Sequence, residues 1–432
     1  MNFRKILFWC HLAVGSIAGL VILTMCVTGV LLAFERQIIS YAEHSFRVTP
    51  PADAHRLSLE ALLENAHAVN PTAPTNVVWK ADASAPVEVS VGRNQSLLLN
   101  PYSGAVLGEG ARHTRAFFHS VEDIHRWLAA SPEHRATGRA VTGSCNLGFL
   151  FLVLSGPFLW LPRTWTRAAV QAGTRFKFSL RGKARDFNWH NVIGFWTCIP
   201  LAVMVLCAVV MSYPWANNLV YRVKGNPAPP PQNAPQLTIA GSTSQPNAQR
   251  NRNRETPSAA AANKDAGAAP WSGLDALSHR AETRVPEWRT ITARLGAPSD
   301  ANVTFSIDSG NGGRPDKRAQ LTLNRKTAAE IRWEPFSSYN SGRQLRAWIR
   351  FTHTGEAGGL LGQSIASLAS AGGALLVWTG LSLAMRRLIA SLARRRVTTT
   401  TTAALRAPIG AHPMSLPANT PPLDGDSIQL EN

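Results

Sequence analysis

The sequence predicts a membrane protein: an all-α four-helix transmembrane bundle, built from two pseudo-symmetric halves, with two small α+β domains outside the membrane. Three observations predict this fold class. The 432 residues contain four long apolar segments, basic loops on one side of them, and a repeated order of helices and histidines. The mean hydropathy of −0.06 is that of a soluble protein only because it averages these segments with two long polar connections.

Four apolar segments are long enough to cross a bilayer. A helix needs about 20 apolar residues to span the hydrocarbon core, and each segment meets that length almost without charge. The segments are 6–34, 140–161, 189–215 and 357–385. The first is roughly twice as long as the apolar core of a signal peptide, so we expect it to remain as a transmembrane helix.

The net charge of +18 is concentrated beside these segments. The loop between the second and third segments and the stretch after the fourth carry the basic residues Arg163, Arg167, Arg175, Lys177, Arg181, Lys183, Arg185, Arg386, Arg387, Arg394, Arg395 and Arg396. Short basic loops stay in the cytoplasm, so we expect both termini and the middle loop there. Membrane topology and contact with anionic lipid explain the basic runs, so these runs do not predict nucleic-acid binding.

Each long polar connection predicts a small α+β domain. The first has helical spacing over 57–69, then strand-like alternation over 76–80, 87–91, 96–99 and 105–107. The second has a helical run over 274–283, then strand candidates at 288–295, 302–307, 319–323 and 331–333. Period-2 alternation bounded by turn residues carries the strand predictions.

Two segments are predicted to be disordered. Residues 226–269 are rich in Pro, Ala, Asn, Gln and Ser and cannot bury enough apolar surface to fold, and the C-terminal tail has the same character. The predicted organisation is helix 1 at 1–35, a first domain at 36–112, an interfacial helix at 113–135, helix 2 at 136–162, a basic loop at 163–187, helix 3 at 188–215, a disordered linker at 216–269, a second domain at 270–341, an interfacial segment with helix 4 at 342–386, and a disordered tail at 387–432.

A repeat relates the two halves of the chain. Each half has a helix opening with His-x-x-x-Gly, at His11 or His190, then an α+β domain, a second histidine, at His125 or His353, and a closing helix. The closing helices share a small-residue step, LSGP at 154–157 and WTGL at 378–381. Parallel repeats imply a pseudo-two-fold axis along the membrane normal, with sites between the halves.

The repeat sorts the histidines into two layers. His11 and His190 lie at cytoplasmic helix ends, whereas His125 and His353 precede helices that enter from the other side. An ionisable side chain at such a position is costly to keep, so a functional role is the first hypothesis for each histidine. Each pair could supply both axial ligands of one non-covalent, b-type haem, and two stacked haems would form an electron path across the bilayer. His119 is an alternative to His125, which we prefer because the closing-helix pattern follows it.

Glycines and arginines near the histidines have two interpretations each. Gly15, Gly19 and Gly194 share a helix face with His11 or His190 and would leave room for a flat macrocycle, but the same spacing is a common helix-contact motif. Arg126, Arg139 and Arg350 could bind haem propionates. The alternative is that they are interfacial side chains reaching toward water.

Several chemistries are not predicted. All five cysteines lie in apolar segments and there is no Cys-x-x-Cys-His, so neither a disulfide framework nor covalently attached haem is expected. Gly-x-Gly-x-x-Gly opening a βαβ unit, a Walker loop and His-Glu-x-x-His are also missing from the sequence. Electrons would therefore come from a separate donor, a quinol or a cytoplasmic reductase.

The chain resembles the PepSY-associated transmembrane family. The resemblance covers segments 3–34, 123–160, 186–215 and 351–383, and is strongest at 146–156 (NLGFLFLVLSG) and 212–218 (SYPWANN). The two α+β domains are similar to PepSY domains. Because some members are iron-regulated inner-membrane proteins and one branch consists of dihaem reductases of ferric siderophores, the resemblance implies haem at His11, His190, His125 and His353.

The function expected from the sequence is reduction of a ferric siderophore or other ferric chelate in the periplasm. The protein would lie in a bacterial inner membrane, with its PepSY-like domains shaping a periplasmic docking surface. Two alternatives remain open. One is a membrane protein without haem whose PepSY domains bind or regulate a periplasmic partner, and the other is an accessory that helps transport a siderophore without redox chemistry.

Overall fold

The computed structural model describes residues 2–53, 55–91, 95–162, 164–227, 271–296 and 300–406. Residues Met1–Ala384 form one compact unit, and Met385–Asn432 form a second.

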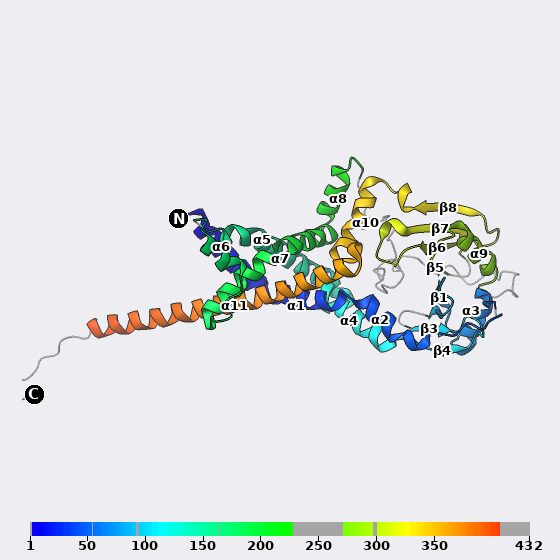
Figure 1. Ribbon diagram of the computed structural model, residues 1–432, viewed down its shortest axis with the longest axis horizontal. Helices are drawn as coiled ribbons and strands as arrows, with labels where there is room; N and C mark the ends of the chain where they lie inside the picture. The colour runs from blue at the N-terminus through cyan, green and yellow to red at the C-terminus, as the bar shows by residue number, and fades with distance from the viewer. Residues whose placement is uncertain are drawn as a thin grey trace, which may run out of the picture. The chain divides into compact units, whose positions relative to one another are not determined.

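Four helices in the described chain are long and apolar enough to cross a membrane, which confirms the prediction. Three lie wholly in the first unit: α1 (Phe3–Leu32), α5 (Arg135–Trp160) and α7 (Gly182–Ser212). The fourth, α11 (Gly359–Arg406), begins in that unit. Helix α5 packs between α1 and α7 (Figure 1). Each of the four helices contributes to one apolar core, at Ile22, Phe149, Leu201 and Ala369.

The predicted repeat is visible in how these helices pack. Glycines at equivalent positions face equivalent side chains of the neighbouring helix, so the pair α1 and α5 is repeated by α7 and α11. In the first half the contacts are Gly148 with Val14 and Gly15 with Leu152; in the second they are Gly372 with Ile193 and Gly194 with Leu376. A glycine at each point allows two helices to approach closely.

The strands form one antiparallel sheet of eight, in the order β4-β3-β2-β1-β5-β6-β7-β8 (Figure 1). They are β1 (Pro74–Lys80), β2 (Val87–Val91), β3 (Gln95–Leu99), β4 (Val106–Gly108), β5 (Thr290–Arg294), β6 (Asn302–Asp308), β7 (Arg318–Asn324) and β8 (Glu330–Pro335). Helices α3 (Leu59–Val69) and α9 (Leu274–Arg284) cover the apolar face. These elements lie within a few residues of the predicted ranges because the alternation is regular; β2, for example, buries Val87, Val89 and Val91.

The two α+β modules differ from the prediction in being joined. Strand β1 pairs with β5, with Val78 opposite Thr292, and one apolar core lies beneath both halves. The backbone N–H of Glu60 donates to the Asp275 carboxylate at 3.1 Å, and that of Asp275 donates to Glu60 at 3.2 Å. Pairing the two strand edges satisfies backbone groups that would otherwise be exposed. Such long-range pairing leaves no local pattern in the sequence.

Short helices connect the sheet to the membrane helices. They are α2 (Glu35–Ala42), η1 (His44–Phe46), α4 (Arg112–Trp127), η2 (Pro132–His134), α8 (Pro214–Val223), η4 (Phe336–Ser338), α10 (Ser341–His353) and η5 (Glu356–Gly358). Two others lie elsewhere: α6 (Arg167–Thr174) joins α5 to α7, and η3 (Pro315–Lys317) lies between β6 and β7. Helices α4 and α10 occupy equivalent places in the repeat. Leu128 after α4 and Gly355 after α10 have φ of 55° and 76°, and this left-handed geometry ends each helix.

The predicted disordered segments fall partly on helices. Helix α8 begins at Pro214, which has no N–H to lose at this position, and it occupies the start of the predicted linker. Helix α11 continues to Arg406 through a stretch rich in Ala, Leu and Arg, which are strong helix formers. The predicted disorder at 387–406 is therefore replaced by helix. The remaining predicted disorder, at 228–269 and 407–432, lies outside the described residues.

Candidate functional site

The first histidine pair, which we call the basal pair, consists of His11 on α1 and His190 on α7. Nδ1 of His11 lies 2.8 Å from the hydroxyl of Ser155 on α5, and Nδ1 of His190 lies 2.9 Å from that of Thr379 on α11. The two imidazoles interact electrostatically with one another. The repeat therefore places both histidines in the same layer, each held by a hydroxyl on the closing helix of its own half.

The second pair, which we call the sheet-side pair, consists of His125 on α4 and His353 on α10. Their ring centroids are 6.5 Å apart, and the ring planes are inclined by 54°. Nδ1 of His125 lies 2.8 Å from the hydroxyl of Thr28 on α1. Nδ1 of His353 lies 2.9 Å from the carbonyl oxygen of Met204 on α7. Helices α4 and α10 thus bring together the two histidines that the repeat predicts as partners.

The hydrogen bonds fix the tautomer of all four rings. The carbonyl of Met204 only accepts, so Nδ1 of His353 carries the proton. Thr28 and Thr379 donate their own hydroxyl protons to carbonyls of the preceding helical turn, at 2.6 and 2.7 Å, and Ser155 does the same at 3.3 Å. Each hydroxyl therefore accepts from its histidine. Every ring then has its Nε2 lone pair available, which is the form that binds a metal ion.

Glycine follows each of the three hydroxyl residues. The position of a Cβ on Gly156, Gly380 or Gly29 would lie 4.0, 3.4 or 3.7 Å from Cε1 of His11, His190 or His125. The neighbouring helices therefore approach these three rings on the side of Nδ1 and Cε1. As whole residues, all four histidines are half-buried.

The sequence prediction missed the hydroxyl groups that position the histidines. Ser155 and Thr379 lie in the small-residue step that identified the repeat, but a hydrogen-bonding role was not assigned to them. Thr28 is also followed by a glycine, so a search of the sequence for hydroxyl–glycine dipeptides would have identified it. The acceptor of His353 could not be predicted in this way: the position equivalent to Thr28 holds Cys207, and the bond goes to the Met204 backbone instead.

His119, the alternative to His125, lies elsewhere on α4. Its Nδ1 is 3.7 Å from a carboxylate oxygen of Asp123, and its side chain is 36% exposed. Because it is His125 whose ring faces His353, the geometry favours the preferred assignment.

The three predicted arginines have different surroundings. Arg126 pairs with Glu122 at 2.9 Å and stacks 4.5 Å from the Trp127 ring. Arg139 is exposed on α5. Arg350 lies one turn before His353 on α10 and interacts electrostatically with that histidine and with Glu356. Burial, with Arg318 and Arg126 nearby, lowers the pKa of Arg350 to about 10, so it remains cationic at neutral pH.

A carboxyl cluster lies at the same end of the bundle. Glu35, the first residue of α2, interacts with Glu122 of α4 and Glu356 of η5. Burial and repulsion by these two carboxylates raise the pKa of Glu35 to about 7, against the opposing effects of Arg115 and Arg36. The surroundings of the sheet-side pair therefore contain charges of both signs.

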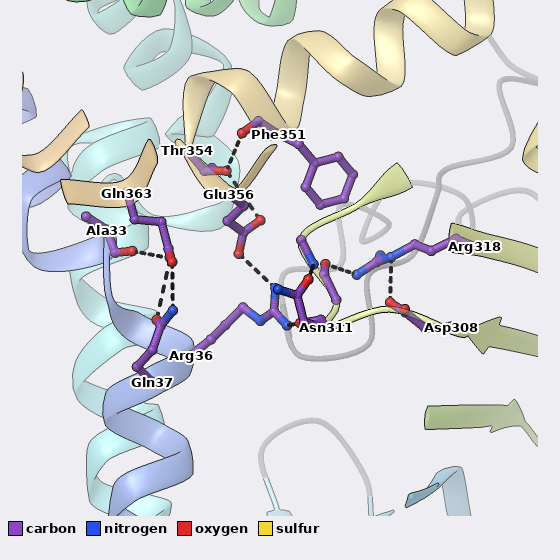
Figure 2. Close-up of polar contacts among 12 residues, drawn as sticks. Ala33, Arg36, Gln37, Asp308, Asn311, Arg318, Phe351, Thr354, Glu356 and Gln363 are labelled. Carbon is purple, nitrogen blue, oxygen red and sulfur yellow. Dashed lines mark hydrogen bonds and ion pairs between the residues drawn. The ribbon is translucent and has the colours of Figure 1, made fainter. Parts of the chain in front are cut away.

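Ion pairs fasten the sheet to the helices that carry this pair. Arg115 on α4 contacts Glu88 on β2 at 3.0 Å. Arg36 on α2 links the two halves, because it bonds Glu356 of η5 at 3.1 Å and the carbonyl of Asn311 in the β6–β7 loop (Figure 2). Arg318 on β7 pairs with Asp308 at 3.0 Å, and its guanidinium lies 5.2 Å from the ring of Phe351, two residues before His353 (Figure 2).

No group of three or more His, Cys, Asp or Glu that could hold a metal ion occurs in the described part of the chain. Two imidazoles suffice for a haem, so the available donor sets are the two histidine pairs.

The fold and the sites define a class of membrane protein in which two repeated halves of a four-helix bundle enclose paired histidines and carry one extramembrane sheet. The family model of the PepSY-associated TM region matches residues 8–387, and the chain belongs to this family. A search of curated proteins finds no matching relative.

Proposed function

We propose that the protein binds two b-type haems, one between the histidines of each pair, and conducts electrons across a bacterial inner membrane to a ferric siderophore or other ferric chelate in the periplasm. In this topology both termini are cytoplasmic and the sheet is periplasmic, as the basic loops indicate. The observation that carries the proposal is the repeated histidine pair with donated Nδ1–H groups.

The sheet-side pair fits haem on geometric grounds. An imidazole nitrogen coordinates a metal at about 2.0 Å, so two imidazoles on opposite sides of one ion have ring centres roughly 6 Å apart. The separation of 6.5 Å between His125 and His353 is close to this value. A histidine that binds a metal almost always donates a hydrogen bond from its other ring nitrogen, as Nδ1 of each of these four histidines does.

The two layers fit an electron path through the bilayer. Along α1, 17 residues separate His11 from Thr28, the partner of His125, which corresponds to about 25 Å of helix. The hydrocarbon core is about 30 Å thick. The pairs would therefore lie toward opposite faces of the membrane.

Bound haem supplies a one-electron couple at each pair. The histidines would hold the iron through Nε2, and Ser155, Thr379, Thr28 and the Met204 carbonyl would orient the rings and raise their basicity. Arg350 has no ion-pair partner among the described residues, so its guanidinium is free to bind a propionate. The net change is the transfer of one electron from a separate donor, a quinol or a cytoplasmic reductase, to the chelated Fe(III), which becomes Fe(II) and is held less tightly by hard oxygen ligands.

The absorption spectrum of the purified protein tests the proposal. We expect a Soret band that shifts on reduction with dithionite, two haems per chain, and rapid reoxidation when a ferric siderophore is mixed with the reduced protein in a stopped-flow instrument. A protein without a Soret band would instead support a binding or regulatory role. A reduced spectrum that does not change on mixing with ferric siderophores would contradict reductase activity.

A further inference from the structure

The loop that joins the two halves of the bundle is held in place beside the basal pair. It runs from the end of α5, through α6, to the start of α7. The side-chain amide of Asn188 on α7 donates to the carbonyl oxygens of Ala172 and Arg175 at 3.0 and 3.2 Å. The carbonyl oxygen of the same side chain accepts from the backbone N–H of Lys177 at 2.9 Å. The loop is therefore fixed to α7 two residues before His190.

Three aromatic rings connect the exposed part of this loop to the basal pair. The side chain of Phe178 is 81% exposed, and its ring stacks on that of Phe176, with the ring centroids 6.0 Å apart. Both rings pack edge to face with the ring of Trp189, at centroid distances of 6.5 and 5.9 Å. Trp189 directly precedes His190 in the chain. A packed aromatic group thus extends from the exposed Phe178 to the neighbour of a proposed haem ligand.

Cations alternate with these aromatic residues and follow them. Residues 175–183 contain four exposed cations and no acidic residue; the cations are Arg175, Lys177, Arg181 and Lys183. Within the described chain, none of the four side chains makes an ion pair. The single acidic residue of the loop, Asp186, is buried, where it pairs with Arg185 at 3.0 Å and accepts from the Ser382 hydroxyl at 2.9 Å. The exposed charge of residues 175–183 is therefore entirely positive.

Membrane topology accounts for the sign of this charge but not for its arrangement. The preference of cytoplasmic loops for Lys and Arg depends on how many cations lie near the helix ends, so a loop of any conformation would satisfy it. Contact with anionic lipid headgroups also needs only cations. Neither requires that the loop be fixed by Asn188 or that Phe178 pack against the residue beside His190. The arrangement indicates a second role.

An exposed apolar centre beside a charged rim is the pattern of a protein-docking surface. Complementary charges steer a partner to the surface and raise the rate of association, and a buried aromatic contact contributes to affinity. Encounters between electron-transfer proteins bury little area, below about 1,200 Å² in total, so one loop provides enough surface. Because the unpaired charges of residues 175–183 are all positive, the complementary partner surface is acidic.

We propose that residues 175–183 dock a small, acidic, soluble protein with an exposed one-electron cofactor, a flavin or an iron–sulfur cluster, and that this protein is the electron donor to the basal pair. The inference rests on the proposed function, since it names the class of the donor. One electron leaves the donor's reduced cofactor, which is oxidised, and reduces ferric iron at the basal pair to ferrous iron. No covalent bond forms or breaks, and a proton lost by a flavin on oxidation passes to solvent.

Binding of oxidised carriers tests the docking surface without electron transfer. Flavodoxin and a [2Fe–2S] ferredoxin, two small acidic carriers, would be titrated against the full-length protein in nanodiscs of phosphatidylcholine, with biolayer interferometry as the measurement. The triple variant Lys177→Gln, Arg181→Gln, Lys183→Gln should weaken binding at least tenfold at low ionic strength and reduce its dependence on salt, because it removes steering charges.

A second triple variant provides the matched control for charge. Lys80→Gln, Arg280→Gln, Lys326→Gln removes the same net charge from exposed positions on the sheet and on α9, so it should bind both carriers like the parent. A smaller effect of the first triple variant than of this control would mean that net charge, and not residues 175–183, attracts the carriers, and would overturn the proposal.

The apolar centre is tested separately from the rim. Phe178→Ala leaves every cation in place and should weaken binding roughly threefold to tenfold at both low and high ionic strength, because salt does not screen an apolar contact. Phe117→Ala is the control, since Phe117 is a half-exposed phenylalanine on α4. Parental affinity in both Phe178→Ala and the first triple variant would overturn the docking surface and leave its cations to lipid. Absence of binding by both carriers to the parent would also overturn it.

Failure of the proposed function gives a different result. If the protein holds no haem, both carriers would still bind and would still depend on Phe178. If haem is present, reduced flavodoxin and reduced ferredoxin should reduce it in a stopped-flow instrument, and Phe178→Ala should slow this reaction but not reduction by the neutral quinol duroquinol. Reduction by duroquinol together with no reduction by either bound carrier would overturn the assignment of the donor.

Discussion

The basal pair and the sheet-side pair share one construction but have different surroundings. In the basal pair both histidines donate to hydroxyls at equivalent positions, Ser155 and Thr379. In the sheet-side pair one donates to the Thr28 hydroxyl and the other to the Met204 carbonyl. The electrostatic partners also differ, because Arg126 and Arg350 interact with the sheet-side histidines, whereas His190 interacts with His11.

The difference teaches that the repeat preserves the orientation of the ring even where one of the groups that orient it is lost. His125 also hydrogen-bonds the backbone of Met25, at the position equivalent to Met204, so the backbone acceptor remains where Cys207 occupies the position of Thr28, and Nδ1–H is still donated. The nearby cations are specific to the sheet side. A cation stabilises an added electron, so Arg126 and Arg350 raise the reduction potential of the sheet-side pair, against the opposing effect of Glu122 and Glu356.

The largest effects should come from the histidines themselves. Replacing His190 with Ala should remove the basal haem, and replacing His125 with Ala should remove the sheet-side haem, so each variant keeps one haem per chain. The pyridine haemochrome assay measures this ratio. His119→Ala is the control on the same helix as His125 and should retain both haems. Loss of haem from His119→Ala with retention in His125→Ala would reverse the assignment.

The hydroxyl that orients a histidine should matter less than the histidine. Thr379→Val removes the acceptor of His190 and keeps the side-chain shape, and such changes typically weaken metal binding by about 10- to 100-fold. Thr197→Val on α7 is a matched control, because its hydroxyl bonds only the Ile193 carbonyl of its own helix. Haem loss to apomyoglobin provides the measurement. Equal loss rates in the two variants would show that Thr379 does not tune the site.

A smaller effect should separate the potentials of the two pairs. Arg350→Gln removes a cation that interacts with His353 and not with the basal pair. We expect the midpoint potential of the sheet-side haem to fall by about 40 mV, which for one electron corresponds to roughly 1 kcal/mol. Spectroelectrochemical titration of the parent and variant checks this. An equal shift of both midpoints would mean that the charge does not distinguish the two layers.

The sequence predicted the parts of the fold that depend on local pattern. Apolar length gave the four membrane helices, and period-2 alternation gave the strands, because burial on one face imposes that period directly. The pairing of β1 with β5 was not predictable, since it depends on two edges more than 200 residues apart. The histidine positions followed from the repeat, but the Met204 carbonyl carries no side-chain signal. Helix at 387–406 was missed because the polar composition of the tail outweighed its high helix propensity.

The last effect, on stability against pH, tests whether the carboxyl cluster on the sheet side is destabilising. The folded-state pKa of Glu35 is raised to about 7 from an ordinary value of 4.5. Its contribution to stability is therefore full below pH 4.5 and is lost as the pH rises through 7, when a partly buried carboxylate must ionise beside Glu122 and Glu356. Glu35→Gln cannot ionise, so it should be more stable than the parent at pH 8 and similar at low pH.

The upper limit of that difference is about 3 kcal/mol, and screening by solvent reduces it. Thermal unfolding at pH 4.5 and pH 8, followed by tryptophan fluorescence, measures it as a stability gain that grows with pH. Glu64→Gln, an exposed position on α3, should give no such trend. A constant difference between Glu35→Gln and the parent would show that Glu35 does not titrate in this range. Repulsion within the carboxyl cluster would then not destabilise the sheet side relative to the basal side.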